Sequence, residues 1–229
     1  MATFLELVNK VGPESGTVSG SLGAIASATG RWAKVVGWTR DAWSQIQRER
    51  GDWTFRQKQF SGTLTAGLSE YTAASFGITD FGGWLRDSGA LEYDGLRPFS
   101  LYDPDRGRED EGHLRVIPHA QWLRSWDLGD PDNQRPTVVA EGPLRTLLFG
   151  PPPDKGYIVR GWYKRAVQEL TNGEDTPYID PEFHDAIKWK AIELLAQHDE
   201  AEFHLATAGN QYRAVRSQMI RAYVPQVRM

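Results

Sequence analysis

The sequence contains no cysteine. This absence excludes disulfide bonds, thiolate metal sites and cysteine nucleophiles together. No apolar run approaches the length of about 18 residues that a membrane-spanning helix requires, and the start of the chain lacks the basic and apolar segments of a signal peptide. We therefore expect a soluble protein that has no membrane partner and folds in a reducing cytoplasm.

Neither sign of charge dominates the sequence. Its 30 acidic and 26 basic residues are mixed along the chain and leave a formal net charge of -4. The chain therefore lacks the positive excess that would recruit nucleic acid or an acidic membrane non-specifically. With 229 residues, of which 40% are hydrophobic, the chain is long enough to bury a core of its own.

Recognisable catalytic and ligand-binding motifs are also missing. The segment 150–156 is rich in proline where a phosphate loop needs free backbone N–H groups, and no Lys-Ser or Lys-Thr pair follows it. His198 and Glu202 have the spacing of two metal ligands on one helix face, but His204 lies off that face and nothing nearby completes the set. We expect no catalytic, metal-binding or cofactor-binding residues, and therefore no cofactor.

Helical patterning is present at both ends of the chain. Thr3 and Glu6 have the spacing of a capping box, and Asp180-Pro181 is an N-cap followed by proline at the first helical position. Apolar residues then recur at intervals of three and four, with a break at Gly209-Asn210. The predicted helices are 3–11, 22–50, 181–208 and 210–223. Because each has a single apolar face, we expect them to pack together.

The middle of the chain is β-prone and rich in turn residues. The clearest pair of strands is 137–149 against 157–165, with 150–156 as the hairpin connection. In the second strand, alternation puts large side chains on both faces. That pattern is typical of a sheet that is packed on one face and used for contact on the other. A short helix is expected within 118–126.

These patterns predict an α+β fold, in which N- and C-terminal helices form a helical bundle around an inserted antiparallel β region. We expect the bundle to comprise 1–52 and 178–223 and the inserted β-rich region to comprise 53–177. Residues 224–229 would form a C-terminal extension. The region 102–132 is charged and loop-rich, and the sequence assigns it no role. Its most polar stretch, 103–112, is expected to be a solvated loop.

Two compositional features each allow two interpretations. The nine tryptophans fit either a tryptophan-rich core or protein–protein contacts, because tryptophan buries a large area at little entropic cost. After Glu202 the chain has no acidic residue but carries four arginines, Arg213, Arg216, Arg221 and Arg228. Such a tail is either a frayed end, with arginine favoured near a helix C-terminus, or an arm that docks on an acidic partner.

The order of these elements resembles the head-to-tail adaptor (connector) family of tailed bacteriophages. The resemblance covers nearly the whole chain: a short helix, a long helix ending in a tryptophan-rich turn at 43–55, and then short strands. Its most specific parts are the proline-rich segment 147–153 leading into the aromatic strand 157–163, and the segment 177–184 that opens a helix. Residues 99–132 are more charged than the family pattern.

The resemblance implies a structural subunit rather than an enzyme. Family members form a homo-oligomeric ring, commonly a dodecamer, in the neck of the virion between the portal protein and the tail or nozzle proteins. DNA passes through the central channel without sequence-specific binding, and assembly takes place in the host cytoplasm. A C-terminal extension reaches the portal. Carried to this chain, portal docking falls on Arg221, Tyr223, Val224, Pro225, Val227 and Arg228.

A ring built from one kind of subunit needs two unlike patches on each copy. The two-faced strand 157–165, the tryptophan-rich turn and the basic tail are candidates for such patches. The residues predicted to form the subunit or tail interface are Trp43, Trp53, Phe55, Tyr157, Trp162 and Pro152.

Three other functions stay open from the sequence alone. One is a different phage neck or tail-completion protein, which would not join the tail to the portal. Another is a virion-associated cell-wall hydrolase, which would need two carboxylates brought together by the fold. The third is a nucleic-acid-binding module, whose affinity for duplex would fall steeply with salt.

Overall fold

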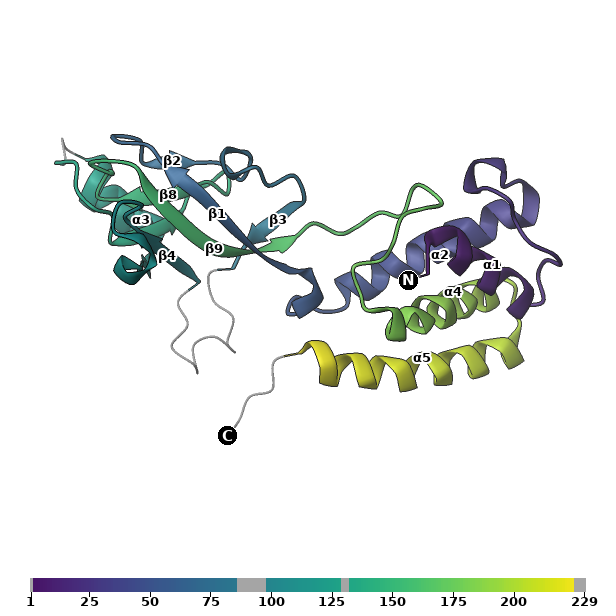
Figure 1. The fold of residues 1–229 in the computed structure, drawn as a ribbon. Helices are drawn as coiled ribbons and strands as arrows, with labels where there is room; N and C mark the ends of the chain where they lie inside the picture. The colour runs from purple at the N-terminus through teal and green to yellow at the C-terminus, as the bar shows by residue number, and fades with distance from the viewer. Residues whose placement is uncertain (1, 86–97, 129–131, 225–229) are drawn as a thin grey trace. The chain divides into compact units, whose positions relative to one another are not determined.

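The computed structural model describes residues 2–85, 98–128 and 132–224. They divide into two compact units: a helical unit contributed by the chain up to Phe55 and from Val167 onward, and a β unit formed by Arg56–Ala166. Figure 1 shows the helices α1, α2, α4 and α5 in the first unit and the strands in the second. The predicted α+β class is confirmed.

The helical unit is built around one hydrophobic cluster. Its helices are α1 (Phe4–Glu14), α2 (Gly30–Arg48), α4 (His184–His198) and α5 (Glu202–Tyr223), with short 3-10 turns at Ile25–Ser27, Thr54–Arg56 and Pro181–Phe183. The capping box is present at the start of α1: the Thr3 N–H donates to Glu6 Oε2 at 2.9 Å, and the Glu6 N–H donates to Thr3 Oγ1 at 3.3 Å. All of the longer helices contribute side chains to the cluster.

Three predicted helix boundaries are wrong. The helix expected from residue 22 begins at Gly30, although Ile25 and Ala28 pack against the same cluster from outside the helix. The helix expected over 181–208 is interrupted after His198, where Glu200 has a φ of 55°. No break occurs at Gly209, where one was predicted: α5 runs through this glycine, which is buried, and α5 packs on α4.

The β unit contains two sheets. The first has the order β1-β9-β4-β5, and β3 also pairs with β9; the second has the order β2-β8-β7-β6. The strands of the first sheet are β1 (Gln57–Leu64), β3 (Phe81–Trp84), β4 (Phe99–Tyr102), β5 (Gly112–His113) and β9 (Tyr157–Arg165). Those of the second are β2 (Glu70–Tyr71), β6 (Arg115–Val116), β7 (Val138–Glu141) and β8 (Leu147–Gly150). Short 3-10 turns lie at Ala74–Phe76 and Gly107–Asp110.

The predicted hairpin of 137–149 against 157–165 is wrong. β9 pairs with β1 over its whole length up to Lys164, from Gln57↔Lys164 to Leu64↔Tyr157, whereas β8 pairs with β7 in the other sheet. The physical reason is that β8 is buried on both faces: Leu147 and Phe149 enter the larger cluster of the β unit and Leu148 enters a smaller one. The proline-rich segment therefore carries the chain from one sheet to the other.

One strand pair departs from the antiparallel arrangement predicted for this region. β6 runs parallel to β7, with Arg115 opposite Val138. A parallel pair needs a crossover connection rather than a tight turn. Here the connection contains α3 (His119–Trp122) and a π turn at Leu123–Asp127, so the short helix expected within 118–126 is present. Trp122 and Trp126 on this connection pack over the smaller cluster.

Candidate interaction surfaces

The last turn of α5 is fixed to the helical unit by Tyr223. Its ring lies edge-on to Phe55 and Phe183, with centroids 5.2 and 5.3 Å away. Its hydroxyl donates to Asp180 Oδ2 at 2.6 Å and accepts the Asp180 N–H at 3.0 Å, while Thr54 Oγ1 donates to its carbonyl. Burial and the Asp180 hydrogen bond raise the pKa of Tyr223. Any segment that continues beyond α5 therefore starts from a fixed point.

The residues predicted to dock on the portal differ in their surroundings. Arg221 is exposed, and its Nε donates to the Ser217 carbonyl at 3.3 Å. Tyr223 and Val224 are half-buried and pack against the hydrophobic cluster of the helical unit. Pro225, Val227 and Arg228 lie outside the described residues. Tyr223 is thus already engaged in contacts within the chain.

Most residues predicted for the subunit or tail interface lie in the chain's own core. Trp43 and Trp53 are fully buried, and the Trp53 indole N–H donates to the Ile46 carbonyl at 2.9 Å. The Phe55 ring stacks on Trp43 and lies tilted against Trp53, with centroids 5.8 and 5.4 Å away. Tyr157 is buried in the β unit and bonded to Asp154, and burial raises its pKa to about 12. The turn at 43–55 is therefore a structural element of the isolated chain.

Pro152 and Trp162 have different environments. Pro152 is half-buried, and its carbonyl accepts the Gln134 N–H at 2.8 Å. Trp162 is 39% exposed, which makes it one of the large hydrophobic side chains that the described residues present to solvent. Among the predicted interface residues, Trp162 is therefore the one whose side chain offers substantial apolar surface to a partner.

Trp162 lies on the outer face of the first sheet. In β9 the inward positions Tyr157, Val159 and Tyr163 are buried in the core, while Arg160 and Trp162 point away from it. The register places Trp162 opposite Gln59 of β1, and Arg160 between Ser61 of β1 and Ser100 of β4. A shallow hollow of about 160 Å³ opens there, lined by Gln59, Pro98, Ser100, Glu111, His113, Arg160, Gly161 and Trp162. We call these residues, apart from Gly161, whose Cα faces the core, the Trp162 face.

Glu111 holds the charged side chains of this face in place. It accepts hydrogen bonds from Ser100 Oγ at 2.6 Å and from Arg108 Nη2 at 3.0 Å, and Arg160 Nη1 lies 3.2 Å from its Oε1. Burial opposes its charge, but the Ser100 and Arg108 hydrogen bonds and the charge of Arg160 lower the pKa of Glu111. An ionised carboxylate therefore holds the guanidinium of Arg160, which lies on the same face of β9 as Trp162.

The loop that carries Glu111 is tied down at several points. Lys155 bonds to Asp103, which lowers the pKa of that carboxyl, and Arg135 Nη1 lies 2.6 Å from Asp110 Oδ2. Arg135 also donates to the Leu101 carbonyl at 3.2 Å. The stretch 103–112 thus has exposed side chains, while hydrogen bonds and ion pairs hold it to the rest of the β unit. Sequence reasoning missed this role for Glu111, because Ser100 and Arg160 reach it from other strands and only Arg108 is close to it along the chain.

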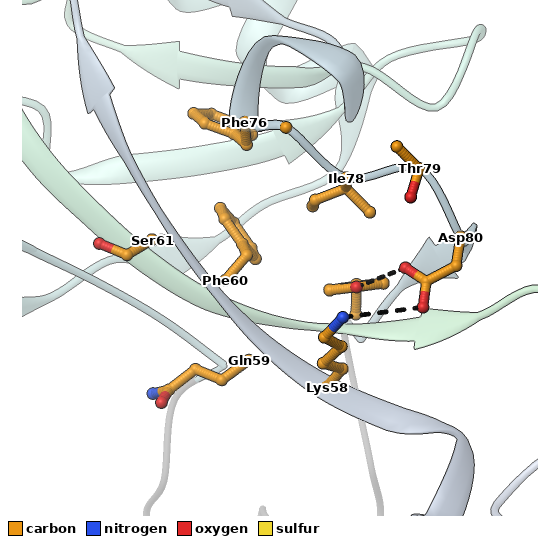
Figure 2. A pocket seen from close by; sticks show the side chains of 10 residues that line it. Lys58, Gln59, Phe60, Ser61, Phe76, Ile78, Thr79 and Asp80 are labelled. Carbon is orange, nitrogen blue, oxygen red and sulfur yellow. Dashed lines mark hydrogen bonds and ion pairs between the residues drawn. The ribbon is translucent and has the colours of Figure 1, made fainter. Parts of the chain in front are cut away.

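A second hollow of about 160 Å³ lies between β1 and the segment 76–80 (Figure 2). Phe60, Phe76 and Ile78 line it, and Asp80 closes one side. Asp80 accepts the Tyr163 hydroxyl at 2.6 Å, and Lys58 Nζ lies 3.9 Å from its other oxygen. These paired groups tie the segment 76–80 to the sheet, so the hollow is a structural feature rather than a candidate binding site.

Within 2–85, 98–128 and 132–224, no group of three or more histidine or acidic side chains is arranged to hold a metal ion. His198, considered above as a ligand, has its Nδ1 2.9 Å from Asp199, which is paired with Arg31. No helix in the described part of the chain combines the length and apolarity needed to cross a bilayer.

No curated protein sequence matches the chain. A family described as SU10 adaptor protein matches residues 2–229, which is nearly the whole chain and includes both the helical and the β unit. The phage adaptor resemblance inferred from the order of elements therefore agrees with an independent match. The chain belongs to the SU10 adaptor protein family, a family of phage structural adaptors.

Proposed function

We propose that this protein is a head-to-tail adaptor subunit. Copies of it form a ring, commonly a dodecamer in such families, beneath the portal of a tailed phage. The ring joins the portal to tail or nozzle proteins in the neck of the virion and surrounds the DNA channel. The observation that carries the proposal is the family match over residues 2–229. Subunits are made in the host cytoplasm and take part in no catalysis.

The Trp162 face supports a protein contact. Tryptophan and arginine dominate the binding energy of protein interfaces, and they do so best when polar groups around them are already satisfied. Trp162 is partly exposed, and Arg160, two residues earlier on the same face, is held by Glu111 at 3.2 Å. This combination gives a rigid apolar centre with a preorganised polar rim. We propose that a sister subunit or a tail protein packs on it.

A closed ring needs a second, unlike patch on each subunit. The turn between β7 and β8 offers one: Leu144 is 87% exposed there, and the neighbouring Arg145 holds the turn by donating to the Gly82 carbonyl. An exposed leucine on a fixed turn differs in shape from the concave Trp162 face. We propose that the two patches serve different neighbours.

Portal docking is proposed for the extension 224–229. Its support is the anchor before it: Tyr223 is fixed by Asp180, Phe55 and Phe183, so the extension leaves the helical unit from a defined position. We further propose that the bundle of 1–52 and 178–223 and the inserted region 53–177 act as separate domains, each meeting different partners.

The test is addition of purified protein to portal-bearing heads, measured by sedimentation and by images of the vertex. Deletion of residues 224–229 removes the proposed docking segment, and Trp162→Ala removes the centre of the Trp162 face. Leu68→Ala is the matched control, because Leu68 is also an exposed large hydrophobic residue of the β unit. We expect both test variants to fold, with the deletion failing to join heads and Trp162→Ala giving incomplete rings.

Normal incorporation of the deletion variant would remove the docking role. Normal rings from Trp162→Ala would remove the interface role of that face. Absence of the wild-type protein from vertices, or cleavage of cell walls by the purified chain, would refute the adaptor function itself.

A further inference from the structure

The exposed side of α5 carries arginines that pair with no acidic side chain in the described part of the chain. Arg213, Ser217 and Arg221 follow one another at intervals of four residues and are all exposed. Residues four apart on a helix lie on the same side, so the three form a continuous stripe. We call them the α5 stripe. From residue 203 to the end of the chain there is no aspartate or glutamate.

The arginines of the stripe are held by their own helix and not neutralised. Arg213 Nε donates to the Gly209 carbonyl at 3.1 Å and Arg213 Nη2 to Asn210 Oδ1 at 2.8 Å. Arg221 Nε donates to the Ser217 carbonyl at 3.3 Å. By contrast, Arg216 on the neighbouring side of α5 is paired with Glu49 at 2.8 Å. Within the described residues, the two stripe arginines have no acidic partner, so their charge faces outward.

The surroundings of the stripe distinguish between two anionic partners. A protein interface needs an apolar anchor at its centre, and the large exposed hydrophobic residues of the described chain, Leu68, Leu128, Leu144 and Trp162, all lie outside α5. The exposed neighbours of the stripe are small or amide side chains: Asn210, Gln211, Ala214, Gln218 and Ala222. A surface that offers arginine side chains and hydrogen-bond donors, but no large apolar side chain, is suited to bind the phosphate backbone of a nucleic acid.

The geometry also suits a duplex. Arg213 and Arg221 are eight residues apart, a rise of about 12 Å along the helix. This is close to the width of about 12 Å of the major groove of B-DNA. A helix lying across the groove therefore brings one guanidinium to each bordering strand. The two full charges also outweigh the roughly half negative charge at the C-terminal end of the helix dipole.

We propose that the α5 stripe is the surface of this subunit that faces duplex DNA, and that it contacts phosphates weakly and without sequence preference. The duplex as partner rests on the proposed function. Arg221, which the sequence grouped with the portal-docking residues, is assigned to this stripe instead. With two phosphate contacts per subunit the attraction is small enough for DNA to slide past, and a ring of subunits still keeps the duplex centred.

The test is binding of purified full-length protein to a fluorescent DNA duplex of arbitrary sequence, followed by anisotropy as salt is raised. Two phosphate contacts give a log–log salt slope of about −1.8, or about a 60-fold loss of affinity for a tenfold rise in salt. We expect Arg213→Gln/Arg221→Gln to abolish binding at low salt. The control is Arg115→Gln/Arg124→Gln, which removes the same charge from exposed arginines of the β unit and leaves binding unchanged.

Three results would overturn the inference: equal duplex binding by wild type and the stripe variant, an equal loss in the control variant, or binding to a polyglutamate peptide at least as tight as to the duplex. The last result would assign the stripe to an acidic protein. Because the readout uses purified protein and DNA, it is independent of addition to heads. Failure of wild-type protein to join heads would refute the adaptor function and leave the stripe's affinity for duplex standing.

Discussion

Gly161 and Trp162 are adjacent in β9 but point to opposite faces, and the structure gives them opposite roles. A Cβ atom added at Gly161 would lie 2.5 Å from Phe99 Cδ1 and 2.7 Å from Phe60 Cε1. Both rings are buried in the core of the β unit, so they have little room to move. Overpacking of a dense core costs about 1–3 kcal/mol. We therefore expect Gly161→Ala to lower the free energy of unfolding of the β unit by about 2 kcal/mol.

The assay is urea unfolding followed by far-UV circular dichroism, with hydrogen exchange to identify the strands that open. With a slope of about 2 kcal/mol per M urea, a loss of about 2 kcal/mol lowers the midpoint by about 1 M. Gly156→Ala is the matched control in the same unit, because its added Cβ would meet only ordinary contacts, the nearest at 3.6 Å. An unchanged midpoint for Gly161→Ala would refute the packing argument.

Comparing the unfolding of Trp162→Ala with that of Gly161→Ala shows whether Trp162 contributes to the stability of the fold or to contacts between proteins. Trp162→Ala removes an exposed side chain whose cross-strand pair with Gln59 contributes roughly 0.2–1 kcal/mol. Its unfolding midpoint should therefore fall less than that of Gly161→Ala. If Trp162→Ala lowered the unfolding midpoint more than Gly161→Ala does, a failure of the Trp162→Ala variant to form rings would have to be explained by unfolding.

Two further variants probe the helical unit. Tyr223→Phe keeps the ring contacts but removes the hydroxyl that donates to Asp180 at 2.6 Å, and we expect a loss of about 1 kcal/mol in equilibrium unfolding, since the pair is partly exposed; a change below about 0.3 kcal/mol would contradict the anchoring role. Burial lowers the pKa of His184 from its ordinary value of 6.5, so the unfolded chain takes up the proton first. The stability due to neutral His184 is therefore present above pH 6.5 and lost below it, by up to about 1.4 kcal/mol per pH unit. In the wild type, His184 Nε2 lies 3.2 Å from the Ile179 carbonyl. His184→Gln keeps a donor for this carbonyl but does not titrate, so its unfolding midpoint should change less between pH 7.5 and 5.5 than that of the wild type. Equal pH dependence of the two proteins would refute the role of His184.

Local chemistry was sufficient to predict several elements. The capping box at Thr3 and Glu6 involves only neighbouring residues, and it forms as the spacing indicates. The alternation of β9 places Trp162 and Arg160 on one face in the sequence and in the structure, because a strand has a period of two whatever it pairs with. The acid-free end of the chain was equally visible in the sequence, and so was the order of elements that identified the family.

Tertiary structure decided which segments meet. The sequence paired 137–149 with 157–165 because they are close along the chain. In the structure β9 pairs instead with the distant strand β1, from Gln57↔Lys164 to Leu64↔Tyr157, and β8 is buried between two clusters. Composition could not tell a core tryptophan from an exposed one, and only packing separated Trp43 and Trp53 from Trp162. Glu111 reaches Arg160 from a separate loop. Periods, caps and charge are properties of neighbouring residues, whereas strand pairing, burial and ion pairs depend on contacts between distant segments that form only when the whole chain folds.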